Sequence, residues 1–378
     1  MKFVLAPDKY KGSLTGHEFC DAVESGLKKV FPDAEILKRP LADGGDGTIE
    51  VVAHYLNAHS VSLAVTDPLF RKIKTDYLLS DDKKTAFIEM SEASGYKLLD
   101  KTEMNCMHTT SLGTGEMILD ALEKGTKHIV LGIGGSATND GGMGMATALG
   151  YEFLDENGTV LEPVGKNLGH VMEIRSEKAH EKLRDVSIQV ACDVNNPLYG
   201  KNGAAHVYGP QKGASPEEVE LLDKGLEHFA TVIHSTFGID VQEIPGAGAA
   251  GGMGAGAVVF LDAKLVSGVD LVMQLANFDE ALDDTDWIIT GEGQLDGQTL
   301  SGKTIAGVIQ VAQKKGVPIA AFCGSTAISI EEMQQMGLDY AVSILNQVGN
   351  LDDAKAKSFQ NLELASYNFA HLLKKSKA

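Results

Sequence analysis

Cysteine is the first residue that this chain has little of. Its 378 residues include only four cysteines, Cys20, Cys106, Cys192 and Cys323, which lie far apart and match no metal-ligand or redox spacing. The histidines are equally scattered, so neither a zinc site nor a redox-active cysteine pair is expected. We expect the four cysteines to be buried free thiols in a reducing cytoplasm.

Positive charge and long apolar runs are also scarce. Lys and Arg total 33 against 52 Asp and Glu, which gives a net charge of −19. This balance repels polyanions and argues against nucleic acid as a partner, although local lysines or backbone amides can still bind a small anion. No segment approaches the roughly twenty apolar residues of a membrane span. Because Pro7 and Asp8 interrupt the first apolar run, we expect no signal peptide and no membrane partner.

The rest of the composition is that of an ordinary globular protein. Hydrophobic residues make up 43% of the chain and charged residues 22%, and we find no internal repeat or long low-complexity tract. Disorder is therefore not expected. The length is sufficient to bury a large core and suggests two or three domains.

Hydrophobic periodicity predicts a βαβ unit at the start of the chain. It consists of a strand at 3–6, a helix at 14–30 with Ser13 or Thr15 as N-cap, and a strand at 34–41. The next elements predicted are strands of an antiparallel meander at 61–66, 73–79 and 85–90, a helix at 115–124, and strands at 128–131 and 186–191. After residue 280 the α/β alternation resumes, with strands at 287–290, 319–323 and 341–345 and a helix at 305–315.

This order of elements predicts an α/β fold with a discontinuous first domain. Residues 1–60 and 281–378 would form a doubly wound, Rossmann-like or flavodoxin-like domain. Residues 61–280 would form an inserted mixed α/β domain, with a cleft between the two. Doubly wound sheets bind ligands at the carboxyl ends of their strands, so the segments that follow the strands are the candidate sites.

The segment Gly132–Gly142 is the most informative of these. It follows a predicted strand and combines five glycines with small polar residues, whereas an ordinary turn needs one or two glycines at most. Glycine lets the backbone approach a ligand closely, and a loop that exposes backbone N–H groups can wrap an anion. The candidate binding residues are Gly134, Gly135, Ser136, Asn139 and Asp140.

Charged residues follow the first two predicted strands. Lys11 and Ser13 precede a helix N-terminus, which predicts a local anion site. Asp43 and Asp46 stand three residues apart among glycines. Such a pair is suited to magnesium or to accepting a proton from a substrate hydroxyl. Helix capping and turn formation are the alternative explanations for both segments.

Acidic residues follow two later strands. Asp193 comes after the strand at 186–191, and Glu292 and Asp296 come after the strand at 287–290. A carboxylate at the end of a parallel strand is a common catalytic placement, although Asn195-Asn196-Pro197 is also a turn signal. We treat all of these acids as candidates for metal binding or proton transfer.

Two further glycine-rich segments have simpler explanations. Residues 297–304 fit the P-loop pattern GxxxxGK[ST], but residues 291–296 separate them from the preceding strand, and a capped helix N-terminus accounts for the match. Residues 245–256 are rich in glycine and alanine, which more often serves close backbone packing. We favour the structural interpretation for both.

Glycine and aspartate segments after strands, with lysines at one of them, fit phosphoryl transfer, in which positioning and charge neutralisation do most of the catalysis. A flavin- or nicotinamide-binding protein is the alternative. Against it, Ala137 stands where the dinucleotide-binding pattern GxGxxG requires its last glycine.

Seven ordered blocks match a known family: APDKYKGS at 6–13, PLADGGDGT at 40–48, TSLGTG at 110–115, GIGGSATNDGG at 132–142, CDVNNP at 192–197, PGAGAAGG at 245–252 and TGEGQLD at 290–296. On these blocks the chain resembles the bacterial glycerate kinases of the first type, nearly end to end. The resemblance implies ATP-dependent phosphorylation of D-glycerate to 2-phosphoglycerate or 3-phosphoglycerate, a requirement for Mg²⁺, and an active site between two α/β domains. A kinase of another small hydroxy acid would share this chemistry.

The resemblance carries over residue by residue with some departures. The family usually has a small residue at Lys9, commonly Glu at Asp46, and more often another small residue at Gly297. Our hypothesis assigns catalytic roles to Lys11, Asp43 and Asp193, with Arg71 as a further partner for a substrate carboxylate. Metal ligands would come from Asp193, Asp296 and Glu292. The hypothesis leaves open which acid is the base and whether the protein is a homo-oligomer.

Overall fold

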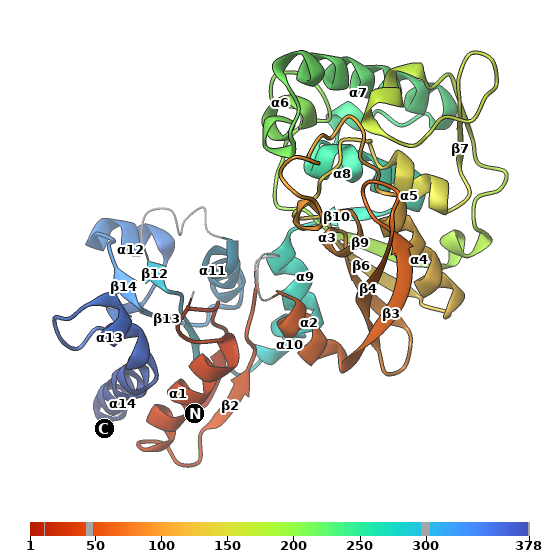
Figure 1. Cartoon of the computed structure of the whole chain (residues 1–378). Helices are drawn as coiled ribbons and strands as arrows, with labels where there is room; N and C mark the ends of the chain where they lie inside the picture. The colour runs from red at the N-terminus through yellow and green to blue at the C-terminus, as the bar shows by residue number, and fades with distance from the viewer. Residues whose placement is uncertain (11, 43–47, 296–302, 377–378) are drawn as a thin grey trace. The chain divides into compact units, whose positions relative to one another are not determined.

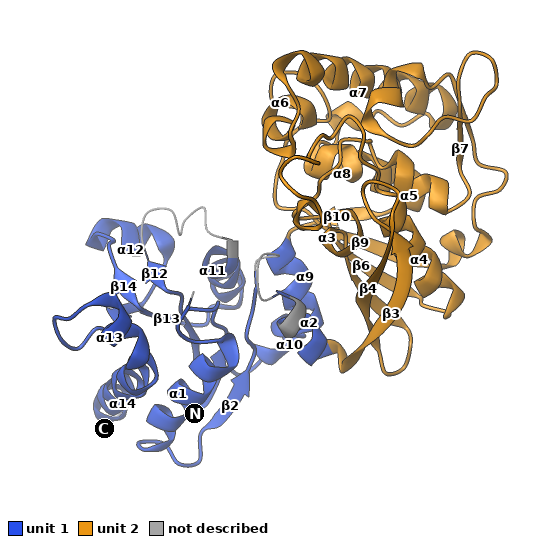
Figure 2. Ribbon diagram, in the orientation of Figure 1, with its two compact units in different colours: residues 1–55, 268–378 blue, residues 56–267 orange. Residues whose placement is uncertain are grey.

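Figure 1 shows the computed structural model of the chain, which describes residues 1–10, 12–42, 48–295 and 303–376. The chain forms two compact units, coloured separately in Figure 2. Unit 1 comprises residues 1–55 and 268–378, and unit 2 comprises residues 56–267. The predicted domain junctions, at 60 and 280, lie 5 and 13 residues further along the chain than these boundaries, and the domain division itself stays a prediction.

Local packing explains where the units divide. Strand β3 (Ala58–Thr66) starts before residue 61 and pairs along its whole length with a strand of unit 2. Helix α9 (Gly268–Leu275) packs on α11 (Lys303–Lys315), since a Cβ placed on Gly307 would lie 3.2 Å from side-chain atoms of both Val269 and Met273. Helix α9 therefore belongs to unit 1 although it precedes residue 281.

Unit 1 contains a five-stranded parallel sheet. Its strand order is β15 (Tyr340–Ser343), β13 (Ile319–Cys323), β11 (Trp287–Thr290), β1 (Lys2–Leu5) and β2 (Glu35–Lys38). If the five strands are renumbered by their order in the chain and read from β2 to β15, their order is 2-1-3-4-5, which is that of flavodoxin-like sheets. The predicted doubly wound fold is therefore confirmed. The direction of winding reverses between β1 and β11, and ligands of such sheets bind beyond the carboxyl ends of the strands at that point.

The helices of unit 1 cover this sheet. Helix α1 (Gly16–Lys28) begins at Thr15, the second of the two predicted caps, whose side chain and backbone form a capping box with Glu18. The remaining elements are α2 (Thr48–Leu56), α10 (Phe278–Ala281), β12 (Gln294–Leu295), β14 (Ser325–Thr326), α12 (Ile330–Met336), α13 (Leu351–Ala356) and α14 (Ser358–Ser376). The core between the sheet, α1 and α14 is aromatic, with Phe322 packing edge-on against Phe369.

Unit 2 contains a mixed six-stranded sheet. Its order is β10 (Lys264–Val266), β9 (Ser187–Ala191), β6 (His128–Gly132), β5 (Thr85–Glu89), β4 (Lys72–Ser80) and β3. Strands β3, β4 and β5 are antiparallel, as the predicted meander requires. Strands β5, β6, β9 and β10 are parallel. The carboxyl ends of these four strands therefore lie along one edge of the sheet, which we call its carboxyl edge, in unit 2 as well as in unit 1.

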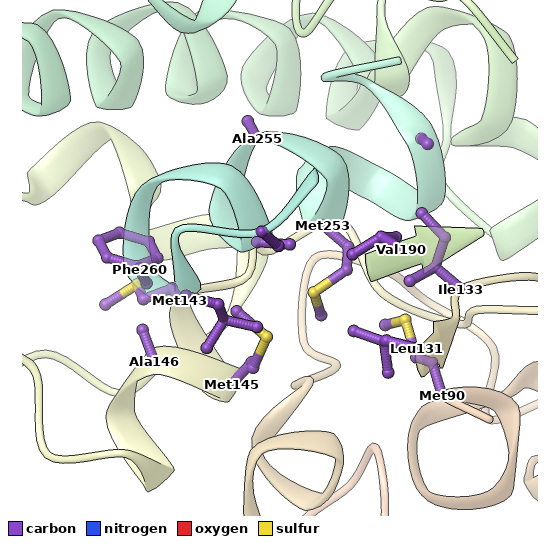
Figure 3. Close-up of a cluster of buried hydrophobic side chains, with 14 of the residues drawn as sticks. Met90, Leu131, Ile133, Met143, Met145, Ala146, Val190, Met253, Ala255 and Phe260 are labelled. Atoms are coloured by element: carbon purple, nitrogen blue, oxygen red, sulfur yellow. The ribbon is translucent and has the colours of Figure 1, made fainter. Parts of the chain in front are cut away.

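The other elements of unit 2 surround this sheet. They are α3 (Ser91–Ser94), η1 (Tyr96–Leu98), α4 (Leu112–Glu123), α5 (Met143–Ala148), β7 (Glu152–Leu154), η2 (Gly165–His170), β8 (Glu173–Arg175), η3 (Glu181–Asp185), α6 (Ala204–Tyr208), η4 (Pro210–Lys212), α7 (Pro216–Phe237), η5 (Val241–Glu243) and α8 (Ala249–Leu261). Figure 3 shows part of the core, where Leu131 and Val190 of the sheet lie near Met145 of α5 and Met253 of α8.

The glycine- and alanine-rich segment 245–256 enters α8 through a kink. Ala250, Gly251 and Gly252 have φ values of 53°, 74° and 89°, in the left-handed region that disfavours any residue with a Cβ. The kink brings α8 onto the glycine loop, because the Gly141 N–H donates to the Gly251 carbonyl at 3.0 Å. These contacts support the packing interpretation of the segment.

Two general features complete the fold. Across the described ranges, none of the helices combines the length and apolarity needed to cross a membrane. The four cysteines are free thiols, and three of them are buried.

Candidate functional site

The parallel strands of unit 2 end side by side. In the sheet register, Gly132 is paired with Glu89 on one side and with Ala191 on the other, and Ala191 is paired with Val266. These strands therefore all end at the same edge of the sheet. Because of this alignment, the segments that follow β6 and β9 lie on neighbouring strand ends, and these carry the glycine loop and Asp193.

The glycine loop exposes only its tip. Gly134 and Gly135 are exposed, whereas the side chains from Ser136 to Asp140 are buried. Within the described structure, no atom lies within 4 Å of the point where a Cβ on Gly134 would stand. The tip therefore offers backbone to a ligand, and the polar residues that follow it turn back into the unit.

The buried half of the loop is tied to three neighbouring segments. The Ala137 N–H donates to the Ser94 carbonyl at 2.9 Å, and the Tyr96 N–H donates to the Gly135 carbonyl at 3.0 Å. The hydroxyl of Thr109 donates to the Ala137 carbonyl at 2.8 Å. Together with the contact to the α8 kink, these bonds fix the loop before any ligand binds.

Asp140 has a structural role that the sequence did not reveal. Its fully buried carboxylate accepts hydrogen bonds from the backbone and hydroxyl of Ser111 at 2.8 and 2.7 Å. It accepts two more from the N–H groups of Gly142 and Gly144, both at 3.2 Å. Burial raises the pKa of Asp140 and these hydrogen bonds oppose the rise. The carboxylate thus anchors the loop to the N-termini of α4 and α5 instead of facing a ligand.

Lys212 is a site residue that sequence reasoning missed. Its side chain is 4% exposed. Its Nζ donates to the Ser136 hydroxyl at 2.8 Å and to the Thr138 carbonyl at 2.7 Å. Burial lowers the pKa of the Lys212 ammonium to about 8. This cation lies directly beneath the loop, and no local sequence signal pointed to it, because η4 lies more than seventy residues from Ser136.

Asn139, a predicted ligand-binding residue, lies inside the unit. Its side chain is 0% exposed. Among the residues that the structure describes, neither its Oδ1 nor its Nδ2 has a hydrogen-bond partner, and the same holds for the Thr138 hydroxyl. Buried polar atoms are normally paired. The underside of the loop is therefore a polar region as well as a rigid one.

Glu89 is a second residue that the sequence did not single out. It ends β5, and a Cβ on Gly132 would stand 2.5 Å from the Glu89 Oε2. Its carboxylate therefore lies over the start of the glycine loop. Burial raises the pKa of Glu89 to about 7; the negative charge of Glu92 adds to this rise and Lys97 opposes it. The only sequence signal was its place at the end of a predicted strand.

Unit 1 has its own carboxyl edge at the point where winding reverses. The Asp8 N–H donates to the Gly291 carbonyl at 2.9 Å, which ties the ends of β1 and β11 together. The hydroxyl of Thr304 donates to the Asp8 carboxylate at 2.9 Å. Helix α11 thus begins at this edge, and the partly buried Glu292 follows β11 there.

Two predicted binding residues are engaged within their own units. The Ser13 hydroxyl lies 2.7 Å from the Ser358 hydroxyl at the start of α14. Arg71, in unit 2, pairs with Asp67 (Nε–Oδ2, 2.6 Å) and with Glu103 (Nη1–Oε1, 2.8 Å). A substrate carboxylate would have to compete with these two acids for Arg71.

Several predicted residues lie outside the described residues, namely Lys11, Asp43, Asp46 and Asp296. Of the proposed metal ligands, the structure describes Asp193 in unit 2 and Glu292 in unit 1. Within the described ranges, no group of three His, Cys, Asp or Glu side chains is arranged to hold a metal ion. The two proposed ligands that the structure describes therefore belong to the sheet edges of different units.

The fold and these edges define an α/β protein with a glycine loop that is tied to its neighbours and has a buried lysine beneath it. The model of the glycerate kinase family matches residues 3–374, and the chain belongs to that family.

Individual relatives agree over nearly the whole length. The chain is 46% identical to a glycerate kinase of Halalkalibacterium halodurans over 370 residues, 97% of each protein. It is 44% identical to the glycerate 2-kinase of Escherichia coli, over 99% of this chain and 98% of the relative. A crystal structure of a putative glycerate kinase 2 from Salmonella typhimurium is similar with a TM-score of 0.88 and 41% identity, over 100% of this chain and 99% of that one.

Proposed function

We propose that this protein is a glycerate kinase, which transfers the terminal phosphoryl group of ATP to a hydroxyl of D-glycerate. The observation that carries the proposal is the end-to-end similarity to proteins named glycerate kinase. Both substrates are anions, and the chain has an overall charge of −19. Binding them requires local sites that reverse this field.

The glycine loop has the properties of such a site. Its tip, Gly134 and Gly135, presents backbone to solvent, and the buried ammonium of Lys212 supplies positive charge from behind. A charge held in a low-dielectric interior acts more strongly than one in water. Phosphoryl transfer depends mainly on positioning and charge neutralisation, so a rigid loop of this kind suits the reaction.

The edge of unit 1 is the second proposed binding site. It combines the reversal point of a flavodoxin-like sheet with the N-terminus of the 13-residue helix α11. Helix N-termini at such points favour phosphate groups. We assign Lys11, Asp43 and Asp46 to this edge on their positions in the sequence, after β1 and β2.

We include Mg²⁺ in the proposal because the candidate side chains have the chemistry that this ion requires. Mg²⁺ prefers oxygen ligands and is usually bound through one or two carboxylates together with substrate phosphates. Asp193 and Glu292 are carboxylates at the ends of β9 and β11, and Asp296 follows in the sequence. When bound, the ion would neutralise charge on the phosphates. We also infer a cytoplasmic location, in keeping with the four free thiols.

The test is a direct assay of the purified protein with D-glycerate and MgATP. We expect ADP release that EDTA abolishes and excess Mg²⁺ restores, and ³¹P NMR of the product distinguishes 2-phosphoglycerate from 3-phosphoglycerate. Faster turnover of another hydroxy acid would support the alternative acceptor. A yellow protein that releases no ADP with glycerate would support the redox alternative.

A further inference from the structure

Glu89 differs from the other buried or half-buried acids of unit 2 in having no partner. Within the described ranges it has no hydrogen bond and no ion pair. Asp67, by contrast, accepts hydrogen bonds from the backbone and guanidinium of Arg71, and Asp140 is anchored by Ser111. A carboxylate that is partly removed from water and lacks compensation is costly to the fold.

The position of Glu89 indicates a functional reason for this cost to stability. Its side chain lies against Gly132, in the strand that leads into the loop. Two residues of chain span at most about 7 Å, so the exposed tip at Gly134 begins close to the carboxylate. On the other side of β6, Asp193 follows Ala191, which is paired with the same Gly132.

We propose that Glu89 is a catalytic residue that accepts the proton of the glycerate hydroxyl during phosphoryl transfer. This inference rests on the proposed function. As the hydroxyl oxygen forms its bond to the terminal phosphorus, its proton passes to the Glu89 carboxylate. The bond between that phosphorus and the bridging oxygen breaks, and its electron pair leaves with ADP. The protonated Glu89 then returns its proton to water.

The charges around Glu89 suit a proton acceptor at neutral pH. The pKa of Glu89, about 7, is raised mainly by burial, and a base is most effective when its pKa lies near the working pH. The titratable groups that face it are Glu92 of α3 and Lys97 of η1, which pair with each other. Asp193 follows the neighbouring strand β9, and Lys212 and the anchored Asp140 are buried beneath the glycine loop.

Glu89→Gln tests the proposal because it keeps the shape of the side chain and removes its basicity. We expect kcat to fall by about 10²- to 10⁴-fold, the usual contribution of general base catalysis. The KM for ATP should change little. Wild-type kcat should decline as the pH falls through about 7, the pKa of Glu89, and this acidic decline should be absent from the residual activity of the variant.

Three further variants separate catalysis from folding. Glu92→Gln is the matched control, since it removes a neighbouring carboxylate that already pairs with Lys97, and it should keep plateau kcat within about threefold. Glu89→Asp keeps the carboxylate but withdraws it, and should recover part of the lost rate. Gly132→Ala places a Cβ 2.5 Å from the Glu89 Oε2 and should lower kcat by displacing the carboxylate. Glu89→Gln should unfold at no lower temperature than the wild type, because it removes a carboxylate that is costly to the fold.

The failure of this inference differs from the failure of the proposed function. If the wild type phosphorylates glycerate while Glu89→Gln retains kcat within about threefold and the same acidic decline, Glu89 is not the proton acceptor. If the wild type releases no ADP with glycerate, the proposed function itself is wrong and this inference falls with it.

Discussion

The two units present the carboxyl ends of parallel strands in different ways. In the glycine loop of unit 2 the exposed part is a pair of glycines, and two charged groups lie beneath it, the buried Lys212 and Asp140, which is held by Ser111. In unit 1 the sequence places its lysines, Lys9 and Lys11, in the segment that follows β1 itself. A cation fixed under a loop is positioned before the ligand arrives, so Lys212 needs no ordering when a ligand binds.

The largest effects are expected from carboxylates after the strands of each unit. Asp193→Asn in unit 2 and Asp43→Asn in unit 1 should each remove most turnover, because each replaces a charged group assigned to orienting the substrate hydroxyl or to binding Mg²⁺. Steady-state assays with glycerate and MgATP measure this. Activity within about threefold of wild type in both variants would contradict the assignment of both edges to catalysis.

Substitution of Lys212 tests whether its buried positive charge contributes to substrate binding. Lys212→Met should raise the KM of one anionic substrate by roughly tenfold, which corresponds to about 1.4 kcal/mol, because it removes the charge behind Gly134 and the hydrogen bonds to Ser136 and Thr138. Lys212→Arg, which keeps the charge, is the control. The substrate whose KM changes identifies the ligand of the glycine loop, and unchanged KM values for both substrates would exclude that role.

The same lysine predicts a pH dependence with a definite sign. Its pKa is lowered from 10.5 to about 8 in the folded protein, so the unfolded chain binds more protons between these values. Stability relative to Lys212→Met should therefore rise with pH across this window. Substrate affinity should fall over the same window as the ammonium discharges. Urea unfolding and KM measurements at pH 7 to 10 check both signs, and parallel wild-type and variant curves would contradict the buried charge.

The contact between β1 and α11 should have a smaller effect, mainly on unit 1. Thr304→Val keeps the shape of a 3% exposed side chain but removes its hydrogen bond to Asp8. We expect a loss of about 1 kcal/mol of stability, measured by urea denaturation. Thr231→Val, which removes a hydroxyl from the exposed face of α7 in unit 2, is the control and should change stability less.

The smallest expected effect is a shift of the acidic decline in kcat. Glu92→Gln removes a negative charge that raises the pKa of Glu89, and Lys97→Met removes a positive charge that lowers it. The decline should therefore move to lower pH in the first variant and to higher pH in the second. Both shifts should shrink at high salt, because these side chains are partly exposed. Shifts of the same sign would contradict the placement of these charges.

Local sequence was sufficient to predict most of the strands. The predicted strands at 287–290 and 319–323 have the bounds that the structure gives to β11 and β13, because apolar runs of this length between loops are typical of buried parallel strands. Local chemistry also included Thr15 as one of the two candidate N-caps of α1, and the structure selects it. The domain junctions were harder to predict from the sequence, since the packing of α9 on Gly307 is a contact between distant segments.

The candidate site was only partly predictable for the same reason. Glycine content marked the loop, but it did not indicate that Gly134 and Gly135 alone would be exposed. Lys212 and Glu89 escaped notice because their roles depend on burial and on contacts with residues far along the chain. Composition identifies a segment that can bind an anion, whereas the groups that support it are set by tertiary structure.

The kink at Ala250–Gly252 links binding to the order in which the chain acquires its structure. More than a hundred residues separate the Gly141 N–H from its acceptor, the Gly251 carbonyl, along the chain. Contacts so distant in sequence form late, because the entropy of loop closure must first be overcome. We therefore expect the glycine loop to reach its final conformation among the last parts of unit 2, so that ligand binding reports the completion of folding.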